Sequence, residues 1–334
     1  MNNFKKIGLT ALAGSLATFS VNAAEMAVSG ATLLTYTTED NTETTGNPFG
    51  MKTNIGFSAS GEVNGYTVSY FSTMSDGMNG LSSNRLSMDM GDIGTISYDN
   101  ASGSGLATID DKTPTAAEEI WDGLGATGAT VGGLVGYGST GVFNYVNSYA
   151  GLTLNAAMRR GSATASGDGA SSGDGKGSFM DAAITGSGDT MGVEGLAWGV
   201  GYGEQDGGDG VTGGDEGDTV DMTAFVNYTY GPVTFGYQES AEDAGGDGGT
   251  NQYGQRWGIA FNVNENLAIS YGEAETQYDG SGTDVTEDID GIAVSYTMGS
   301  MKIAGNRNEG SNIAGTTGVG GQDAMTEIAL SFAF

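Results

Sequence analysis

The chain contains no cysteine and no histidine among its 334 residues. Without cysteine it has no disulfide framework and no thiol nucleophile. Without histidine it lacks the general base of Ser-His-Asp and Cys-His catalysis, and also the commonest zinc ligand. The two absences exclude these catalytic classes and count against zinc enzymes, while chemistry that carboxylates alone can carry stays open.

Basic residues and long apolar runs are also scarce. Eleven Lys and Arg stand against 41 Asp and Glu, a formal net charge of −30. This balance argues against a nucleic-acid partner, because binding to phosphates depends on Lys and Arg. Beyond the first 24 residues, no stretch approaches the ~20 apolar residues of a transmembrane helix. The 61 glycines, which are poor helix formers, also disfavour a helical fold.

The first 24 residues have the features of a secretory signal peptide. Two lysines precede a mildly apolar stretch over 7–21, and Val21-Asn22-Ala23 matches a cleavage site. We expect cleavage to separate a signal peptide, 1–23, from one domain, 24–334. The alternative, an N-terminal membrane anchor, is weaker because Gly, Thr and Ser interrupt the apolar stretch. Without the two lysines the net charge becomes 9 − 41 = −32.

Alternation of apolar with small or polar residues, in segments of about ten, dominates the rest of the chain. In the last segment Ile328, Leu330, Phe332 and Phe334 share one face. This period of two indicates β-strands with one apolar face. We predict sixteen strands, at 26–36, 51–61, 65–74, 84–91, 94–100, 140–149, 151–159, 178–187, 193–204, 218–230, 232–240, 253–263, 267–277, 286–297, 300–308 and 323–334.

The predicted connections alternate between short and long. Short turns such as Gly231-Pro232 alternate with longer polar connections, the longest of which is 101–139. This asymmetry between the two ends is typical of transmembrane β-barrels. The predicted fold class is therefore all-β, an antiparallel transmembrane barrel of about sixteen strands. A soluble β-sandwich or solenoid also alternates. However, the aromatic residues at the ends of the apolar faces fit the girdles of a barrel, and the polar opposite faces fit a wet lumen.

Several segments, in their order along the chain, carry a family resemblance. They include GDIGTISYDN at 91–100, YVNSYAGLTLNA at 145–156, NYTYGPVTFGY at 227–237 and the terminal SFAF. Over its whole length the chain resembles the general bacterial porins of the α-proteobacterial, Rhodobacter-like type. The resemblance implies a sixteen-stranded homotrimer of the cell outer membrane, in which a long third external loop folds into the lumen opposite a basic cluster. The chain departs from the family pattern in having few bases.

The connection 101–139 is the third long loop, which the resemblance places at the pore constriction. Its centre, 113–125, predicts a short amphipathic helix capped by Thr113 or Thr115. The apolar face, which we expect to dock on the barrel wall, consists of Ala117, Ile120, Trp121 and Leu124. The acidic side of the constriction, which we expect to face the pore, consists of Asp110, Asp111, Glu118, Glu119 and Asp122. The alternative is a solvated acidic helix above the membrane.

Strand parity predicts that Arg159, Arg256 and Lys302 face the lumen. A base that faced lipid at mid-membrane would cost ~2–4 kcal/mol, so this placement alone shows no role. For the basic wall of the constriction, which the resemblance implies, the candidates are Arg85 and Arg159. With Lys112, three bases stand against five acids, and the constriction is expected to be negative.

Two glycine- and aspartate-rich connections, 205–217 and 241–252, contribute to the acidic charge. They lack the sustained repeat of Ca²⁺-binding proteins, and single carboxylates in a loop bind Ca²⁺ weakly at best. We expect a solvated acidic rim that divalent cations could bridge to lipopolysaccharide. No metal site and no cofactor is predicted, and weak Ca²⁺ binding at these external loops is left open.

These features favour passive diffusion of ions and small hydrophilic solutes, with a preference for cations, through a water-filled lumen. A channel specific for a sugar or an amino acid is an alternative, although most aromatic residues fall on lipid-facing positions. An outer-membrane barrel enzyme is the alternative from another class, and the missing histidine counts against it. The expected partners are outer-membrane lipid, lipopolysaccharide and further copies of the chain, and no catalytic residue is predicted.

Overall fold

The structure is a computed structural model that describes residues 25–40, 46–74, 80–100, 103, 105–125, 140–161, 177–207, 217–246, 249–280 and 282–334. The predicted signal peptide, 1–23, lies outside these residues. The described residues form sixteen strands: β1 Glu25–Asp40, β2 Phe49–Val63, β3 Tyr66–Met74, β4 Leu81–Asp89, β5 Thr95–Asn100, β6 Thr140–Tyr149, β7 Leu152–Arg159, β8 Phe179–Ser187, β9 Leu196–Gln205, β10 Thr219–Tyr230, β11 Val233–Asp243, β12 Asn251–Asn262, β13 Leu267–Asp279, β14 Val285–Met298, β15 Met301–Ser311 and β16 Asp323–Ala333.

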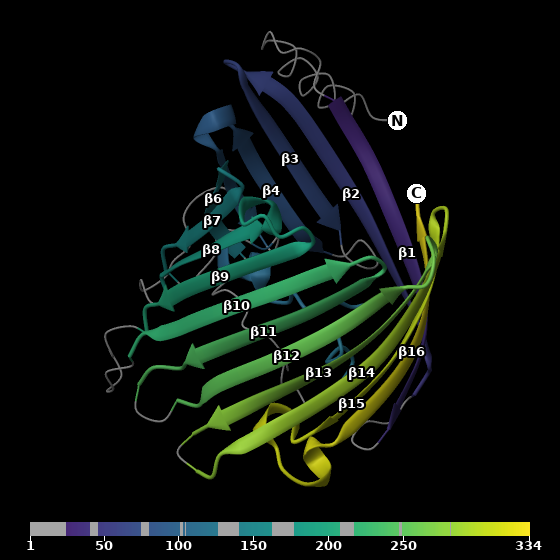
Figure 1. The fold of residues 1–334 in the computed structure, drawn as a ribbon. Coiled ribbons are helices and arrows are strands. Elements are labelled where there is room, and N and C mark those ends of the chain that lie inside the picture. Colours follow the sequence, from purple (N-terminus) through teal and green to yellow (C-terminus); the bar gives the residue numbers. More distant parts are fainter. Residues whose placement is uncertain are drawn as a thin grey trace, which may run out of the picture.

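The strands form one closed antiparallel barrel in which each strand pairs with its neighbours in sequence (Figure 1). The barrel closes where β1 pairs with β16, and the N–H of Phe334 donates to the carbonyl of Gly30 at 2.8 Å. Closure leaves no unpaired sheet edge. The sixteen predicted strands are confirmed. Several strands run further than predicted toward the end with the long connections, since β1 reaches Asp40 and β15 reaches Ser311.

The short connections lie together at the other end of the barrel. At two of them, Asn64-Gly65 and Ala150-Gly151, both residues have positive φ, near 53° for the first and 84° and 79° for the two glycines. These are the angles of two-residue hairpin turns whose twist matches that of the strands. Consecutive strands are therefore joined tightly at this end, and the polar connections are concentrated at the other.

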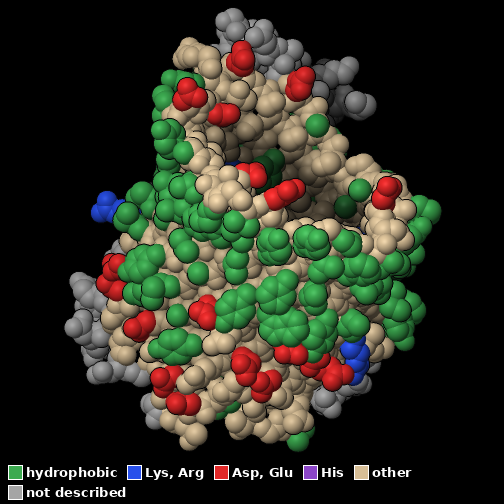
Figure 2. Space-filling view, in the orientation of Figure 1, with side chains coloured by type: hydrophobic (Ala, Val, Ile, Leu, Met, Phe, Trp, Pro, Cys, Tyr) green, Lys and Arg blue, Asp and Glu red, His purple; other side chains and the backbone are tan. Residues whose placement is uncertain are grey.

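The outer face of the barrel is apolar in its middle. Large hydrophobic side chains that are exposed on it include Met180, Val200, Met222, Phe235 and Ile292. Figure 2 shows hydrophobic side chains as a belt across the visible face, with acidic side chains below the belt and a hollow above it. No helix in the described part of the chain is long and apolar enough to cross a membrane.

The helical elements in the described residues are short 3₁₀ turns, among them η3 (Gly105–Ile109), η5 (Ile313–Gly315) and η6 (Val319–Gly321). The helix predicted within 113–125 is wrong. That segment has an irregular backbone with one tight turn, in which the N–H of Asp122 donates to Glu119 and that of Leu124 to Trp121. The described buried hydrophobic residues form small clusters on the inner face of the wall.

Candidate functional site: a loop on the inner wall of the barrel

The connection between β5 and β6 runs along the inner wall of the barrel. Its described residues, 103 and 105–125, are called the inner loop here; residues 126–139 lie outside the described part. Inward side chains of successive strands bind its backbone in sequence order. They are Asn155 on β7, Asp181 on β8, Asn227 on β10, Gln238 on β11, Ser270 on β13, Asn308 on β15 and Asp323 on β16. The loop is thus fixed from β7 to β16.

Gln238 binds the centre of the inner loop. Its Oε1 accepts from the N–H of Lys112 at 2.7 Å, and its Nε2 donates to the carbonyls of Ile109 at 2.8 Å and Asp110 at 3.0 Å. Asn227 donates to the carbonyl of Lys112 at 2.7 Å. Because Gln238 is only 1% exposed, these bonds form away from water, where a lost partner is costly.

A lane of inward-facing glycines lets the loop lie directly on the wall. A Cβ at Gly258 would come 2.8 Å from the carbonyl oxygen of Pro114, and one at Gly291 would come 2.9 Å from Cβ of Ile120. Cβ atoms at Gly201 and Gly236 would collide with Leu106 and Pro114. Larger residues here would push the loop toward the centre of the lumen.

Apolar side chains dock the two ends of the inner loop. Leu106 and Ile109 pack with Ala183 of β8 and Phe225 of β10. At the other end, Leu124 is buried with Ala274, Ile289 and Met325, and Ile120 and Trp121 pack against this cluster. The predicted docking of Ile120, Trp121 and Leu124 on the wall is therefore confirmed, although no helix presents them.

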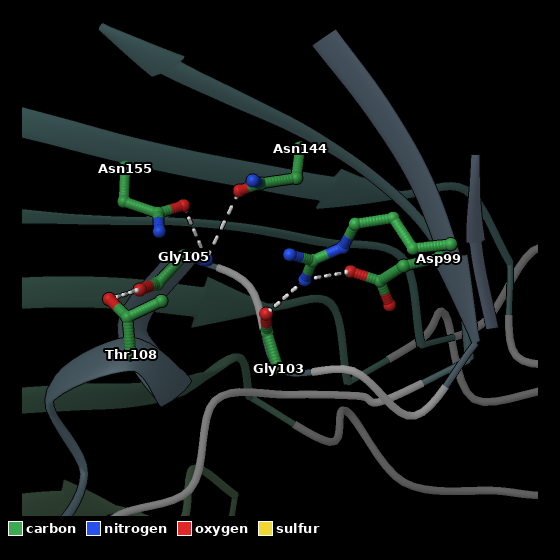
Figure 3. A network of polar contacts seen from close by, with 7 residues as sticks. Asp99, Gly103, Gly105, Thr108, Asn144 and Asn155 are labelled. Carbon is green, nitrogen blue, oxygen red and sulfur yellow. Dashed lines mark hydrogen bonds and ion pairs between the residues drawn. The ribbon is translucent and has the colours of Figure 1, made fainter. Parts of the chain in front are cut away.

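Polar contacts fix the start of the loop (Figure 3). The N–H of Gly105 points between the side chains of Asn144 and Asn155, at 3.3 and 2.9 Å. Arg85 forms an ion pair with Asp99 at 3.0 Å and also donates to the carbonyl of Gly103. Arg85 thus binds the wall and the beginning of the loop together.

One group of carboxylates lies at the centre of the loop. Burial raises the pKa of Asp110 to about 7, and Asp111 adds to the shift through a hydrogen bond and its charge. Burial also raises the pKa of Glu119. Two bases, Lys112 and Arg256, interact electrostatically with this group. The guanidinium of Arg256 lies 4.7 Å from the centre of the Trp121 ring, and it interacts electrostatically with Asp110 and Asp111.

A second group lies where the loop approaches β1, β2 and β16. Glu118 and Asp122 are exposed, and both interact electrostatically with the inward-facing Glu327, which accepts from the hydroxyl of Thr37 at 2.8 Å. Although Asp122 is exposed, partial desolvation by the surrounding wall raises the pKa of its carboxyl, and the positive charge of Lys52 opposes this shift. Carboxylates of the loop and of the wall thus lie together in this region, and Lys52 is the base that interacts with Asp122.

The five predicted acids fall into these two groups, but neither predicted base belongs to them by its described contacts. Arg85 binds Asp99 and the loop start. Arg159 faces inward as predicted, but it lies over the ring of Phe179 at 5.2 Å and donates to the carbonyl of Gly177. The bases that interact with the acids are Lys112, as expected, together with Arg256 and Lys52. Strand parity predicted that Arg256 faces the lumen. No feature of the sequence indicated the level along the barrel axis at which Arg256 or Lys52 lies.

The sequence also gave no indication of Glu327 or Gln238. Both obey the inward parity of their strands, yet their partners lie more than a hundred residues away along the chain. In the described part of the chain, no three acidic side chains are placed to hold a metal ion. Much of the acidic loops for which weak Ca²⁺ binding was left open, including 208–216 and 247–248, lies outside the described residues.

No protein-family model and no curated protein matches the chain. Among solved structures it is similar to OmpT, an outer membrane protein of Vibrio cholerae, with a TM-score of 0.64 and 12% identity over 95% of this chain and 100% of that one. An anion-selective porin from Comamonas acidovorans gives a TM-score of 0.62 and 13% identity, over 93% of this chain and 100% of the porin. The chain has a porin fold. A mutant form of the Rhodopseudomonas blastica porin, at a TM-score of 0.59 and 13% identity over the same shares, agrees with this. The fold implied by the resemblance to porins of this type is therefore confirmed.

Proposed function

We propose that the chain is an outer-membrane porin through which ions and small hydrophilic solutes diffuse passively, with a preference for cations. The observation that supports this most is the inner loop, which is fixed to the wall from β7 to β16 and leaves Glu118 and Asp122 exposed. A polar lumen narrowed by a fixed, charged loop is sufficient for selective diffusion, and no chemical step is needed.

The charges beside the inner loop carry the proposed selectivity. The two groups contain six acids, since Glu327 joins the five of the loop, against the three bases Lys52, Lys112 and Arg256. Charges on the distant rim are screened within ~8–10 Å at physiological salt. Charges on a narrow passage with low-dielectric walls are focused instead. The balance at the loop, rather than the net charge of the chain, is therefore expected to set the preference for cations.

The porin fold itself does not fix the sign of selectivity, because function depends on the residues of a site rather than on its fold. The Comamonas porin is anion-selective by its name. A substrate-specific channel remains the alternative function, but Trp121 and Phe225, two of the inward aromatic residues, pack with the wall and the loop. Two others in the described part of the chain, Phe179 and Tyr278, contact Arg159 and Glu287, so no specific observation favours the alternative.

The outer face supports insertion in a membrane and assembly into a homotrimer. Outward-facing side chains in the described parts of β2–β8 carry no charge, which suits contact with lipid or another subunit. Carboxylates occur on the outward faces of β9, β11 and β13–β15, near the ends with the long connections: Glu204, Glu239, Asp243, Glu273, Glu275, Asp279, Asp288, Asp290 and Glu309. This acidic half is expected to face lipopolysaccharide. A monomeric band in unheated detergent samples that retain the circular dichroism of a barrel would contradict the trimer.

The reversal potential in a salt gradient tests the proposed selectivity. In a planar bilayer, replacing Glu118, Glu119 and Asp122 by their amides is expected to shift it toward anions. The matched control is Glu273→Gln, Glu275→Gln and Asp290→Asn, which removes the same charge from the outer face and is expected to change little. Equal shifts in both triple variants, or none in the first, would refute the proposed role of the inner loop.

A further inference from the structure

The connection between β15 and β16 also enters the barrel. Its turns η5 and η6 are the yellow coils near the bottom of Figure 1. Ile313, at the start of η5, is 0% exposed although it belongs to a loop at the rim. It lies in one cluster with Leu124 of the inner loop and with Ala274, Ile289 and Met325 of the wall. Residues 312–316 are called the clasp below.

The clasp is held by the wall next to it. The N–H of Ala314 donates to a carboxylate oxygen of Glu287 at 2.7 Å, and the hydroxyl of Tyr278 donates to the same oxygen at 3.2 Å. Asn312 donates to the carbonyl of Thr286 at 2.9 Å. Ala314 has a φ of 52°, a left-handed conformation that is costly for a residue with a Cβ. Such a conformation persists only where the surroundings fix it.

The clasp and the last third of the inner loop share their supports. The N–H of Gly125 donates to Asp323, the first residue of β16, at 3.0 Å. Arg256, which lies over the ring of Trp121, also interacts electrostatically with Glu287, the residue that binds the clasp. Leu124 therefore packs against both the wall and Ile313 of the clasp. Because of this shared packing, the loop segment 119–125 cannot leave the wall without disturbing the clasp.

We propose that the clasp positions the inner loop, with Ile313 and Glu287 as positioning residues for the carboxylates of Glu118, Glu119 and Asp122. This inference rests on the proposed function as a channel. The clasp thereby limits the positional fluctuation of the loop carboxylates in the passage. A change in this external segment alters conduction although it lies outside the passage itself.

The test compares Ile313→Ala with Val319→Ala, since Val319 lies in the same connection but is 75% exposed. Single-channel recordings of Ile313→Ala are expected to show greater open-channel noise and a reversal potential nearer to zero. Ile313→Val, which keeps the branched side chain, is expected to restore wild-type behaviour, and Val319→Ala to retain it. Assembly is checked by the heat-dependent mobility of the detergent-solubilised protein.

Unchanged noise and selectivity in an assembled Ile313→Ala channel would overturn the proposal. If that variant does not assemble, Glu287→Gln decides, because it keeps the volume of the side chain while weakening the bond to Ala314. Increased noise in Glu287→Gln supports the clasp, and wild-type behaviour refutes it. A wild-type protein that forms no channel would overturn the proposed function instead, so the two failures are distinguishable.

Discussion

Replacing Gln238 by leucine removes the principal anchor at the centre of the inner loop while leaving the barrel intact. Leucine has a similar size but can form none of the three bonds that Gln238 makes to the backbone of Ile109, Asp110 and Lys112. Each bond contributes a net ~0.5–1.5 kcal/mol. Together the three bonds stabilise the bound position of the loop by about 3 kcal/mol. In the variant, the N–H of Lys112 also loses its partner, which adds to the loss of stability.

A loss of about 3 kcal/mol changes the equilibrium between a seated and a released loop centre by a factor on the order of 100. Gln238→Leu channels are therefore expected to fluctuate between conductance levels, and Asp110 and Asp111 are expected to lose their fixed position beside Arg256. The strands of the barrel do not depend on these bonds, so the circular dichroism of the variant should equal that of the wild type.

Single-channel recording in planar bilayers measures this effect. The control is Gln255→Leu, the same substitution on the outward face of the neighbouring strand β12, which is expected to leave noise and conductance unchanged. A Gln238→Leu channel with the steady single conductance of the wild type would refute the reasoning, because the loop would then not depend on the wall for its position.

Three further outcomes follow from the geometry of the inner loop. Gly258→Ala, which places a Cβ 2.8 Å from the carbonyl oxygen of Pro114, is expected to lower the conductance, whereas Gly305→Ala, whose Cβ would meet nothing closer than 3.4 Å, should not. The carboxyl of Asp110, with its pKa of about 7, is neutral below and negative above that pH, so cation preference should increase from pH 5.5 to 8.5 and Asp110→Asn should reduce this increase. Arg85→Met breaks the ion pair with the buried Asp99, a change that typically costs ~3–5 kcal/mol for a buried pair; the double variant with Asp99→Asn should unfold at a higher temperature than Arg85→Met alone.

The strands could be predicted because each one carries its own signal. In β14 the outward residues Ile292, Val294 and Tyr296 alternate with the inward Gly291, Ala293 and Ser295, and the burial of the strand follows the same alternation. The alternating lengths of the connections then order the strands into a barrel. Neither argument requires knowledge of contacts between distant residues.

The path of the inner loop could not be predicted in the same way. Lys112 is bound by β11 and Ala116 by β13, so four residues span two strand spacings, about 10 Å. A helix of four residues rises only ~6 Å. The amphipathic pattern within 113–125 correctly marks the residues that dock, but the anchors on the wall impose a more extended backbone.

The basic wall of the constriction, Arg85 and Arg159, stays a prediction, and a related reason limits what the sequence says about it. Strand parity predicts whether a side chain faces the lumen or the outside. It does not predict the position of the residue along the barrel axis relative to residues on other strands. Arg159 and Arg256 both face inward, yet Arg159 binds Gly177, just before the start of β8, while Arg256 lies over Trp121. Heights depend on the register between strands, which a single sequence does not reveal.

The central claim is that the inner loop borders a water-filled passage, and a single introduced cysteine tests it most directly. The chain has no cysteine of its own, so Asp122→Cys provides one reactive thiol. A positively charged, membrane-impermeant thiol reagent added during single-channel recording is expected to reduce the cation current in discrete steps, and a reducing agent to restore it. A steady cation current through channels whose Cys at this position is shown to be modified would contradict the account.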